Sequence, residues 1–222
     1  GKVEGVSNGK IYNLEYKGYR YQTVTFDAIM NRFVYQADVK IADPNIQMEM
    51  EGMFVYNDSL PKVKFTTKVS KLIPYELNLY SDSLFSSKFK LNGSITGLDP
   101  DNLTGKITCS IEELTNSKGK LKNKNINILA DYDIIDSIRS FQVLSDFLDI
   151  KLDGDIKPTT IASSFEKYLY TLMPSLTDTL KNPLVLNTDS LFNAFEIQNN
   201  FNYEIKLKDL TAIGKMFLPG IS

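Results

Sequence analysis

The chain has 222 residues, of which 42% are hydrophobic and 23% are charged; this ordinary globular mix excludes a wholly disordered or collagen-like chain. Its 25 basic and 27 acidic residues nearly cancel, and only Arg20, Arg32 and Arg139 are arginines. A net charge of −2 with so few arginines argues against nucleic acid as a partner.

Two features of the composition restrict the chemistry. The sequence has no histidine and one cysteine, Cys109, which excludes catalytic triads with a histidine base, cysteine metal clusters and internal disulfides. Cys109 occupies an apolar position of an alternating segment, so we interpret it as a small core residue. The aspartates of 131–136 and 146–155 fit solvated strand faces better than a catalytic or calcium site. We therefore predict no enzyme activity, no metal and no cofactor.

The dominant pattern along the chain is the alternation of apolar and polar residues, which predicts half-buried β-strands. Asp43-Pro44-Asn45 separates two such runs and predicts a turn. The predicted strands, of which the first two have the weaker pattern, cover residues 11–16, 19–26, 33–41, 46–54, 63–69, 89–95, 103–111, 126–132, 141–145, 148–156 and 201–207.

Helical spacing is confined to the last third of the chain. Ile161, Phe165, Leu169 and Leu172 recur at helical intervals before Pro174, which predicts a helix near 161–173. A short C-terminal helix is expected over 210–217. No membrane span or signal segment is evident, and the start Gly1-Lys2-Val3 suggests a piece of a longer protein.

These elements predict a mainly β fold of antiparallel strands in a single segment, residues 1–222. Alternation alone does not distinguish a sandwich, a closed barrel and one long curved sheet, because each has one apolar face per strand. The 13 phenylalanines and 12 tyrosines lie largely on the apolar strand faces. They fit either a packed core or an apolar groove that faces lipid.

A succession of segments carries a family resemblance. Residues 21–26, then Asp43-Pro44-Asn45-Ile46 running on to Gly52, then Leu60-Pro61 running on to Phe65, and the helical segment 165–172 follow one another. Over roughly residues 9–176 this succession resembles the β-rich periplasmic region of the TamB/AsmA-like envelope proteins of Bacteroidota. The resemblance implies an open, curved antiparallel groove with one or two short helices, in a periplasmic protein anchored in the inner membrane.

The same resemblance implies a function and candidate residues. Such proteins are associated with outer-membrane protein assembly and with phospholipid movement between the membranes, so acyl chains and an outer-membrane assembly protein are the expected partners. The alternatives are a β-rich structural or protein-binding module and, less favoured, a carboxylate-based glycosidase. The expected groove-lining residues are Phe33, Tyr35, Val39, Met48, Met50, Phe54, Val63 and Phe65.

A tripeptide of aspartate, serine or threonine, and an aliphatic residue occurs five times. In the lineage that the sequence resembles, this tripeptide is the acceptor of periplasmic O-glycosylation. Asp-Ser pairs also favour turns and caps, so a structural role stays open. The candidate acceptors are Ser59, Ser83, Ser137, Thr179 and Ser190.

Overall fold

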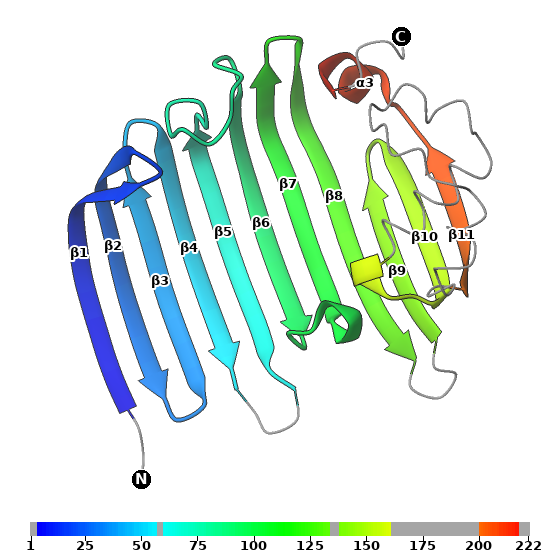
Figure 1. Cartoon of the computed structure of the whole chain (residues 1–222), viewed down its shortest axis with the longest axis horizontal. Coiled ribbons are helices and arrows are strands. Elements are labelled where there is room, and N and C mark those ends of the chain that lie inside the picture. Colours follow the sequence, from blue (N-terminus) through cyan, green and yellow to red (C-terminus); the bar gives the residue numbers. More distant parts are fainter. Residues whose placement is uncertain (1–3, 57–59, 134–137, 161–199, 218–222) are drawn as a thin grey trace, which may run out of the picture.

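The computed structural model describes residues 4–56, 60–133, 138–160 and 200–217. These residues form one sheet of eleven strands in chain order, each antiparallel to the next (Figure 1). The strands are β1 (Glu4–Tyr16), β2 (Tyr19–Asn31), β3 (Val34–Ala42), β4 (Ile46–Val55), β5 (Lys62–Leu72), β6 (Ser86–Thr96), β7 (Thr104–Asn116), β8 (Gly119–Asp133), β9 (Ile138–Ser145), β10 (Leu148–Asp155) and β11 (Asn200–Leu207). A 3₁₀ turn η1 (Pro100–Asn102) precedes β7, and the helix α3 (Thr211–Phe217) follows β11.

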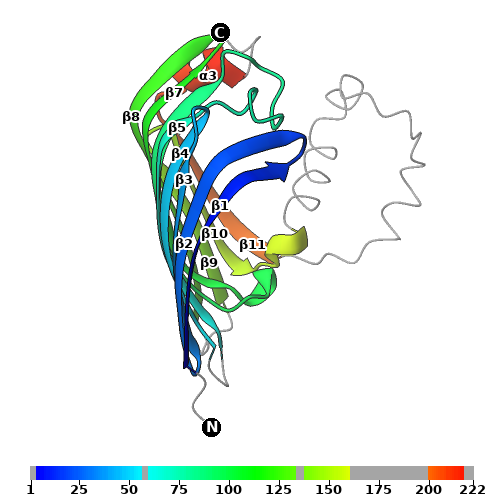
Figure 2. The same cartoon turned by 90° about the vertical axis from the view of Figure 1, so that its left-hand side faces the viewer.

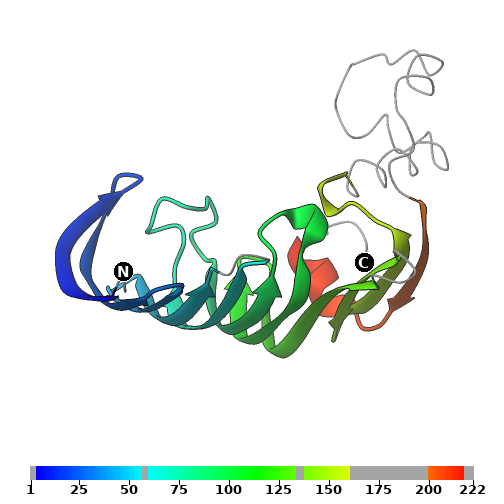
Figure 3. The same cartoon turned by 90° about the horizontal axis from the view of Figure 1, so that it is seen from below.

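The predicted mainly β fold with an open antiparallel sheet is confirmed. β1 and β11 stay at opposite edges and do not pair, so the sheet does not close into a barrel. The sheet is curved, and its hollow side holds α3 and the connection 73–85 (Figure 3). The helix predicted over 210–217 is confirmed as α3, whereas the helix predicted near 161–173 lies outside the described residues.

Interruptions in the strand pairing accompany this curvature. The register shifts between Gln47 and Met48, and again between Lys88 and Phe89, and such bulges increase the bend and twist of a sheet. Gly105 in β7 has a φ of 142° that side chains rarely adopt, and a β-carbon there would collide with the backbone of Ser94. The upper ends of β1 and β2 bend toward the hollow side (Figure 2).

The β3–β4 connection is the turn predicted at Asp43-Pro44-Asn45. The Asp43 carboxylate accepts hydrogen bonds from the Asn45 amide at 2.9 Å, the Gln22 amide at 3.0 Å and the Tyr19 hydroxyl at 2.6 Å. Burial raises the pKa of Asp43, but these donors outweigh burial and hold its pKa below the usual range. One carboxylate thus ties the turn to the upper end of β2.

Two small clusters of buried residues lie at the upper edge of the sheet. One cluster joins Tyr21, Val24 and Leu77, and the second joins Leu121, Phe147 and Met216. Only eight apolar side chains of the described residues are buried. Among the described residues, the rest of the apolar strand face is therefore half-buried or exposed, as expected of a single-layer sheet.

Candidate functional site

The strand pairing places most apolar residues of β2 to β10 on one face. Across the middle of the sheet, Phe26 lies opposite Val39, and Val39 lies opposite Met50. The same face continues through Leu91, Cys109, Ile126 and the later strands. Val24 forms a buried cluster with Leu77, and Val39 and Ile41 pack against this cluster. Because Leu77 belongs to the connection 73–85, which lies on the hollow side, this apolar face is the concave one (Figure 3).

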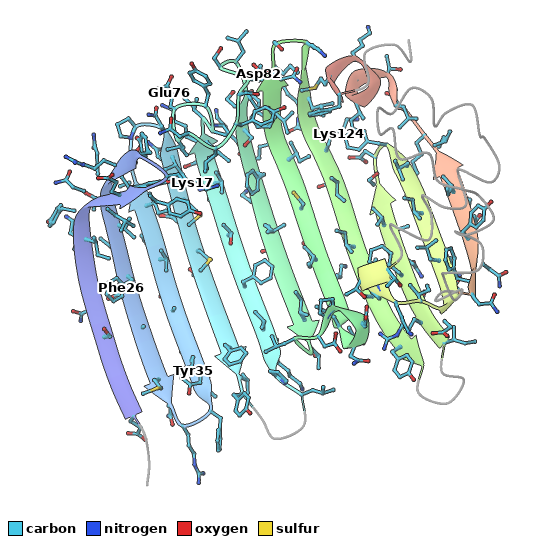
Figure 4. The ribbon with its side chains drawn as sticks, viewed as in Figure 1. Lys17, Phe26, Tyr35, Glu76, Asp82 and Lys124 are labelled. Atoms are coloured by element: carbon cyan, nitrogen blue, oxygen red, sulfur yellow. The ribbon has the colours of Figure 1, made fainter. Side chains whose placement is uncertain are left out.

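Seven of the eight predicted groove-lining residues share this concave face. Tyr35, Phe54 and Val63 form one row across three strands, and Gly52 and Phe65 are neighbours in the next row. Val39 with Met50, and Met48 with Val69, form the two rows above. Phe33 lies in the β2–β3 turn, outside the strands. Figure 4 shows Phe26 and Tyr35 on neighbouring strands of this region.

None of the eight residues is buried. Phe33 is 48% exposed and Tyr35 is 42% exposed, and the other six are half-buried. Over residues 48–51 of β4 and 62–66 of β5, half-buried concave positions alternate with exposed positions on the opposite face, whereas Thr67 and Val69 farther up β5 are buried. This part of the concave face is therefore accessible, which is the condition that a binding groove must meet.

Two aromatic rings lie across glycines of the neighbouring strand. A β-carbon on Gly9 or on Gly93 would overlap the ring of Phe26 or Phe65, respectively. The rings thus cover backbone that has no side chain of its own, an arrangement that stabilises glycine in strands. At Gly52 no atom comes closer than 3.8 Å to the position of a β-carbon. The floor of the concave face, meaning the backbone surface of the sheet, is therefore bare at this position.

The upper rim of the concave face is built by the β5–β6 connection, residues 73–85. Leu77 is fully buried against Tyr21 and Val24, and the Asn78 side chain donates to the Lys17 carbonyl at 3.2 Å. Toward the C-terminal half, α3 takes this place, with Met216 packed on Leu121 and Phe147. Figure 3 shows both segments rising on the hollow side.

The lower rim is tied together by polar contacts. The Thr159 amide and hydroxyl donate to the Asp101 carboxylate at 3.0 and 2.9 Å, which draws the segment after β10 toward η1. The Arg139 guanidinium donates to the Asn102 side chain at 2.8 Å and lies 4.6 Å from the Tyr132 ring. The concave face is thus a trough whose long direction runs across the strands.

The opposite, convex face is mainly polar, with a few apolar residues such as Ile29 and Met53. Asp27, Asp38 and Glu51 are direct neighbours on β2, β3 and β4, and Lys64 and Lys106 flank Ser94 farther along the sheet. A shallow depression crosses these strands. No group of three or more carboxylate or cysteine side chains in the described part of the chain is arranged to hold a metal ion.

Cys109, the single cysteine, lies on the concave face between Leu91 and Ile126. It is half-buried rather than enclosed, and this burial raises the pKa of its thiol. The thiol therefore provides a natural attachment point for a probe on the concave face.

Of the five candidate acceptor residues, only Ser83 lies within the described residues. It is exposed in a turn whose first residue, Asp82, accepts from the Leu84 amide at 2.9 Å and from the Ser117 amide at 3.2 Å. These contacts give the Asp-Ser pair a structural role in joining two upper loops. Modification at Ser83 stays a prediction, and Ser59, Ser137, Thr179 and Ser190 lie outside the described residues.

We found no protein-family model, curated protein or solved structure that matches this chain. The functional argument therefore depends on the sheet itself. No helix among residues 4–56, 60–133, 138–160 and 200–217 is long and apolar enough to cross a membrane.

Proposed function

We propose that this chain is a non-enzymatic segment of a TamB/AsmA-like envelope protein whose concave face shields lipid acyl chains from water. The observation that carries the proposal is the continuous apolar face of β2 to β10, which is half-exposed at Tyr35, Val39, Met50, Phe54 and Phe65. An ordinary core would bury these residues, because a second layer would cover the sheet.

The size of the face fits an acyl chain. Neighbouring strands lie ~4.8 Å apart, so the nine strands β2 to β10 span roughly 38 Å. One leaflet of a bilayer, which holds one acyl chain lengthwise, has a hydrocarbon thickness of about 15 Å, half of the ~30 Å core. The trough is thus longer than one acyl chain and has room for chains along its length.

The energetics favour such binding without any covalent step. Each methylene group withdrawn from water contributes about 0.8 kcal/mol. Ten methylene groups lying on the concave face would therefore contribute roughly 8 kcal/mol before the costs of ordering the chain. The polar residues of the convex face keep that side of the sheet hydrated while the concave face binds lipid.

In this proposal the protein works in the periplasm, as part of a parent anchored in the inner membrane. Its partners are phospholipid acyl chains and, in the assembly role, an outer-membrane assembly protein. The second candidate is a β-rich module that binds another protein without carrying lipid. The unpaired edges of β1 and β11 favour it, because an exposed strand edge pairs readily with another strand.

Native mass spectrometry after detergent-free purification from a host envelope tests the proposal. We expect phospholipid to remain bound to the wild-type chain. Gly52→Phe should displace it, because a β-carbon fits at this position without a clash and the ring it carries would occupy the bare floor. Thr66→Phe is the matched control, since it adds the same ring to the exposed convex face.

A charge on the floor provides a second test. Met50→Glu places a carboxylate in the middle of the concave face, where it should prevent lipid binding and leave the fold intact because the site is open to water. Lipid-free wild-type protein, or a large loss of thermal stability in Met50→Glu with no change in lipid binding, would support the protein-binding module instead.

A further inference from the structure

β1 is a long strand with one unpaired side. It pairs with β2 from Glu4 to Tyr16 except at Asn13, whose φ is 56°, and no other described strand lies beside it. It contains no proline, and it exposes 77% of Val6 and 62% of Tyr12. Long exposed edges of this kind pair readily with a further strand unless they are blocked.

The pairing with β2 determines which way each β1 side chain points. Gly5, Ser7 and Gly9 lie opposite Met30, Ala28 and Phe26, on the concave face. The intervening residues, Val6, Asn8 and Lys10, therefore lie on the convex face. A strand added to this edge continues both faces only if its own apolar and polar sides have the same orientation.

The charged side chains of β1 indicate which strand fits against its unpaired edge. Glu4 and Lys10 lie on the same face, six residues apart and symmetric about Ser7. Among the described residues neither side chain has an ion-pair partner. In an antiparallel second copy of β1 centred on Ser7, each Glu4 would stand opposite Lys10 of the other copy.

We propose that β1 is a self-complementary edge that pairs antiparallel with β1 of a second copy of this chain, with Ser7 on the two-fold axis. The axis is perpendicular to the sheet, so both concave faces open to the same side and join into one trough. Gly5 lies opposite Gly9 of the other copy in this register, and on the concave side the Phe26 ring of each copy covers its own Gly9. The proposal is independent of lipid binding.

Other registers that preserve the faces lose this complementarity. Centring the pair on Asn8 places Lys10 opposite Val6 and Glu4 opposite Tyr12. Centring it on Lys10 places two lysines directly opposite each other, which is destabilising. Only the register centred on Ser7 brings opposite charges together, and it does so twice because the contact is isologous.

A single strand pair buries little surface, and interfaces below about 1,200 Å² are typically weak and transient. A covalent trap therefore detects the contact better than mass alone. Residues directly opposite in an antiparallel pair have α-carbons ~4.5–5.5 Å apart, within the ~4.4–6.8 Å that a disulfide spans. Cysteines one position away from the axis face diagonal neighbours at roughly 7–8 Å, which is too far.

The experiment compares Ser7→Cys with Asn8→Cys, each in a Cys109→Ser background, under mild oxidation of the 222-residue chain. Both native residues are exposed in the same strand, so the two introduced cysteines should be equally accessible to the oxidant. We expect Ser7→Cys to form disulfide dimers and Asn8→Cys to stay largely monomeric. Absence of dimers from Ser7→Cys, or equal yields from both variants, would overturn the proposal.

Charge reversal provides a second, independent measurement in the Ser7→Cys background. In Lys10→Glu two glutamates face each other at both ends of the paired segment. This should slow dimer formation roughly 2- to 30-fold, the range for losing two exposed ion pairs. Adding Glu4→Lys exchanges the two charges and should restore the original rate. Slow dimer formation in the double variant, or no change in the single one, would contradict the register.

Discussion

The anchoring of the upper rim by Leu77 leads to a prediction with a closely matched control. Leu77 has no exposed surface and packs with Tyr21 and Val24, although it lies in a connection between strands. Leu79, two residues on in the same connection, is 44% exposed. Replacing each leucine by alanine removes the same atoms from two sites that differ mainly in burial.

Leu77→Ala should cost about 2–5 kcal/mol, the range for deleting a fully buried leucine side chain and leaving a cavity. For a chain of this size, 1 kcal/mol lowers Tm by about 2–4 °C, so Tm should fall by roughly 4–20 °C. Leu79→Ala should change the stability by less than about 0.5 kcal/mol, because an exposed side chain loses little on truncation.

Thermal unfolding followed by circular dichroism measures both variants. Hydrogen exchange of the amides of Asn78 and Leu79, which donate to the carbonyls of Tyr75 and Pro74, reports whether the connection loosens locally. Equal Tm values for the two variants would refute the argument that burial of Leu77 holds the upper rim on the sheet.

Two further predictions concern the turn and the glycines. The hydrogen bonds that hold the pKa of Asp43 below its usual range stabilise the fold above about pH 4, and this stability is lost as the pH falls through the lowered pKa. Asp43→Asn should therefore flatten the decline of Tm between pH 5 and about 3, and parallel pH profiles for the two proteins would argue against the assignment. Gly105→Ala should cost at least about 2 kcal/mol because of its positive φ and the clash with Ser94, whereas Gly52→Ala should be neutral within about 0.5 kcal/mol. Urea unfolding of both variants compares them directly, and similar midpoints would show that the backbone at Gly105 is not constrained as described.

The strands and the fold class could be predicted because large apolar residues alternate with polar ones. In β4 and β5, residues such as Met50 and Phe65 lie on one face, and Glu51 and Thr66 lie on the other. The turn at Asp43 was also predictable, since proline and a short acidic side chain favour a turn. The choice between an open sheet and a sandwich was not, because both have the same alternation.

The sequence did not reveal where β1 begins. Its concave positions in the lower half are Gly5, Ser7 and Gly9, which provide no apolar alternation. The apolar cover comes instead from β2, whose Phe26 ring lies across Gly9. A pattern within one strand does not report a side chain contributed by its neighbour, so the predicted strand began only at residue 11.

The upper rim was missed for a similar reason. Residues 73–85 have neither helical nor alternating periodicity, and Leu77 is buried only because the connection folds back over β2 and β3. The lysine-rich segment 118–124 contains the start of β8 at Gly119, and Lys120 forms an ion pair with Glu113 at 2.9 Å. The register between β7 and β8 brings this lysine close to Glu113, and that register cannot be read from the sequence alone.

Photo-crosslinking that distinguishes the two faces tests the central claim most directly. p-Benzoylphenylalanine is placed at Met50 and Phe65 on the concave face, and at their chain neighbours Glu51 and Thr66 on the convex face. The protein is then illuminated with phosphatidylethanolamine–phosphatidylglycerol vesicles, and the mass of crosslinked peptides is measured. The proposal predicts phospholipid adducts at Met50 and Phe65 and few at Glu51 and Thr66. Equal labelling of the two faces, or none on either, would contradict an acyl-chain trough.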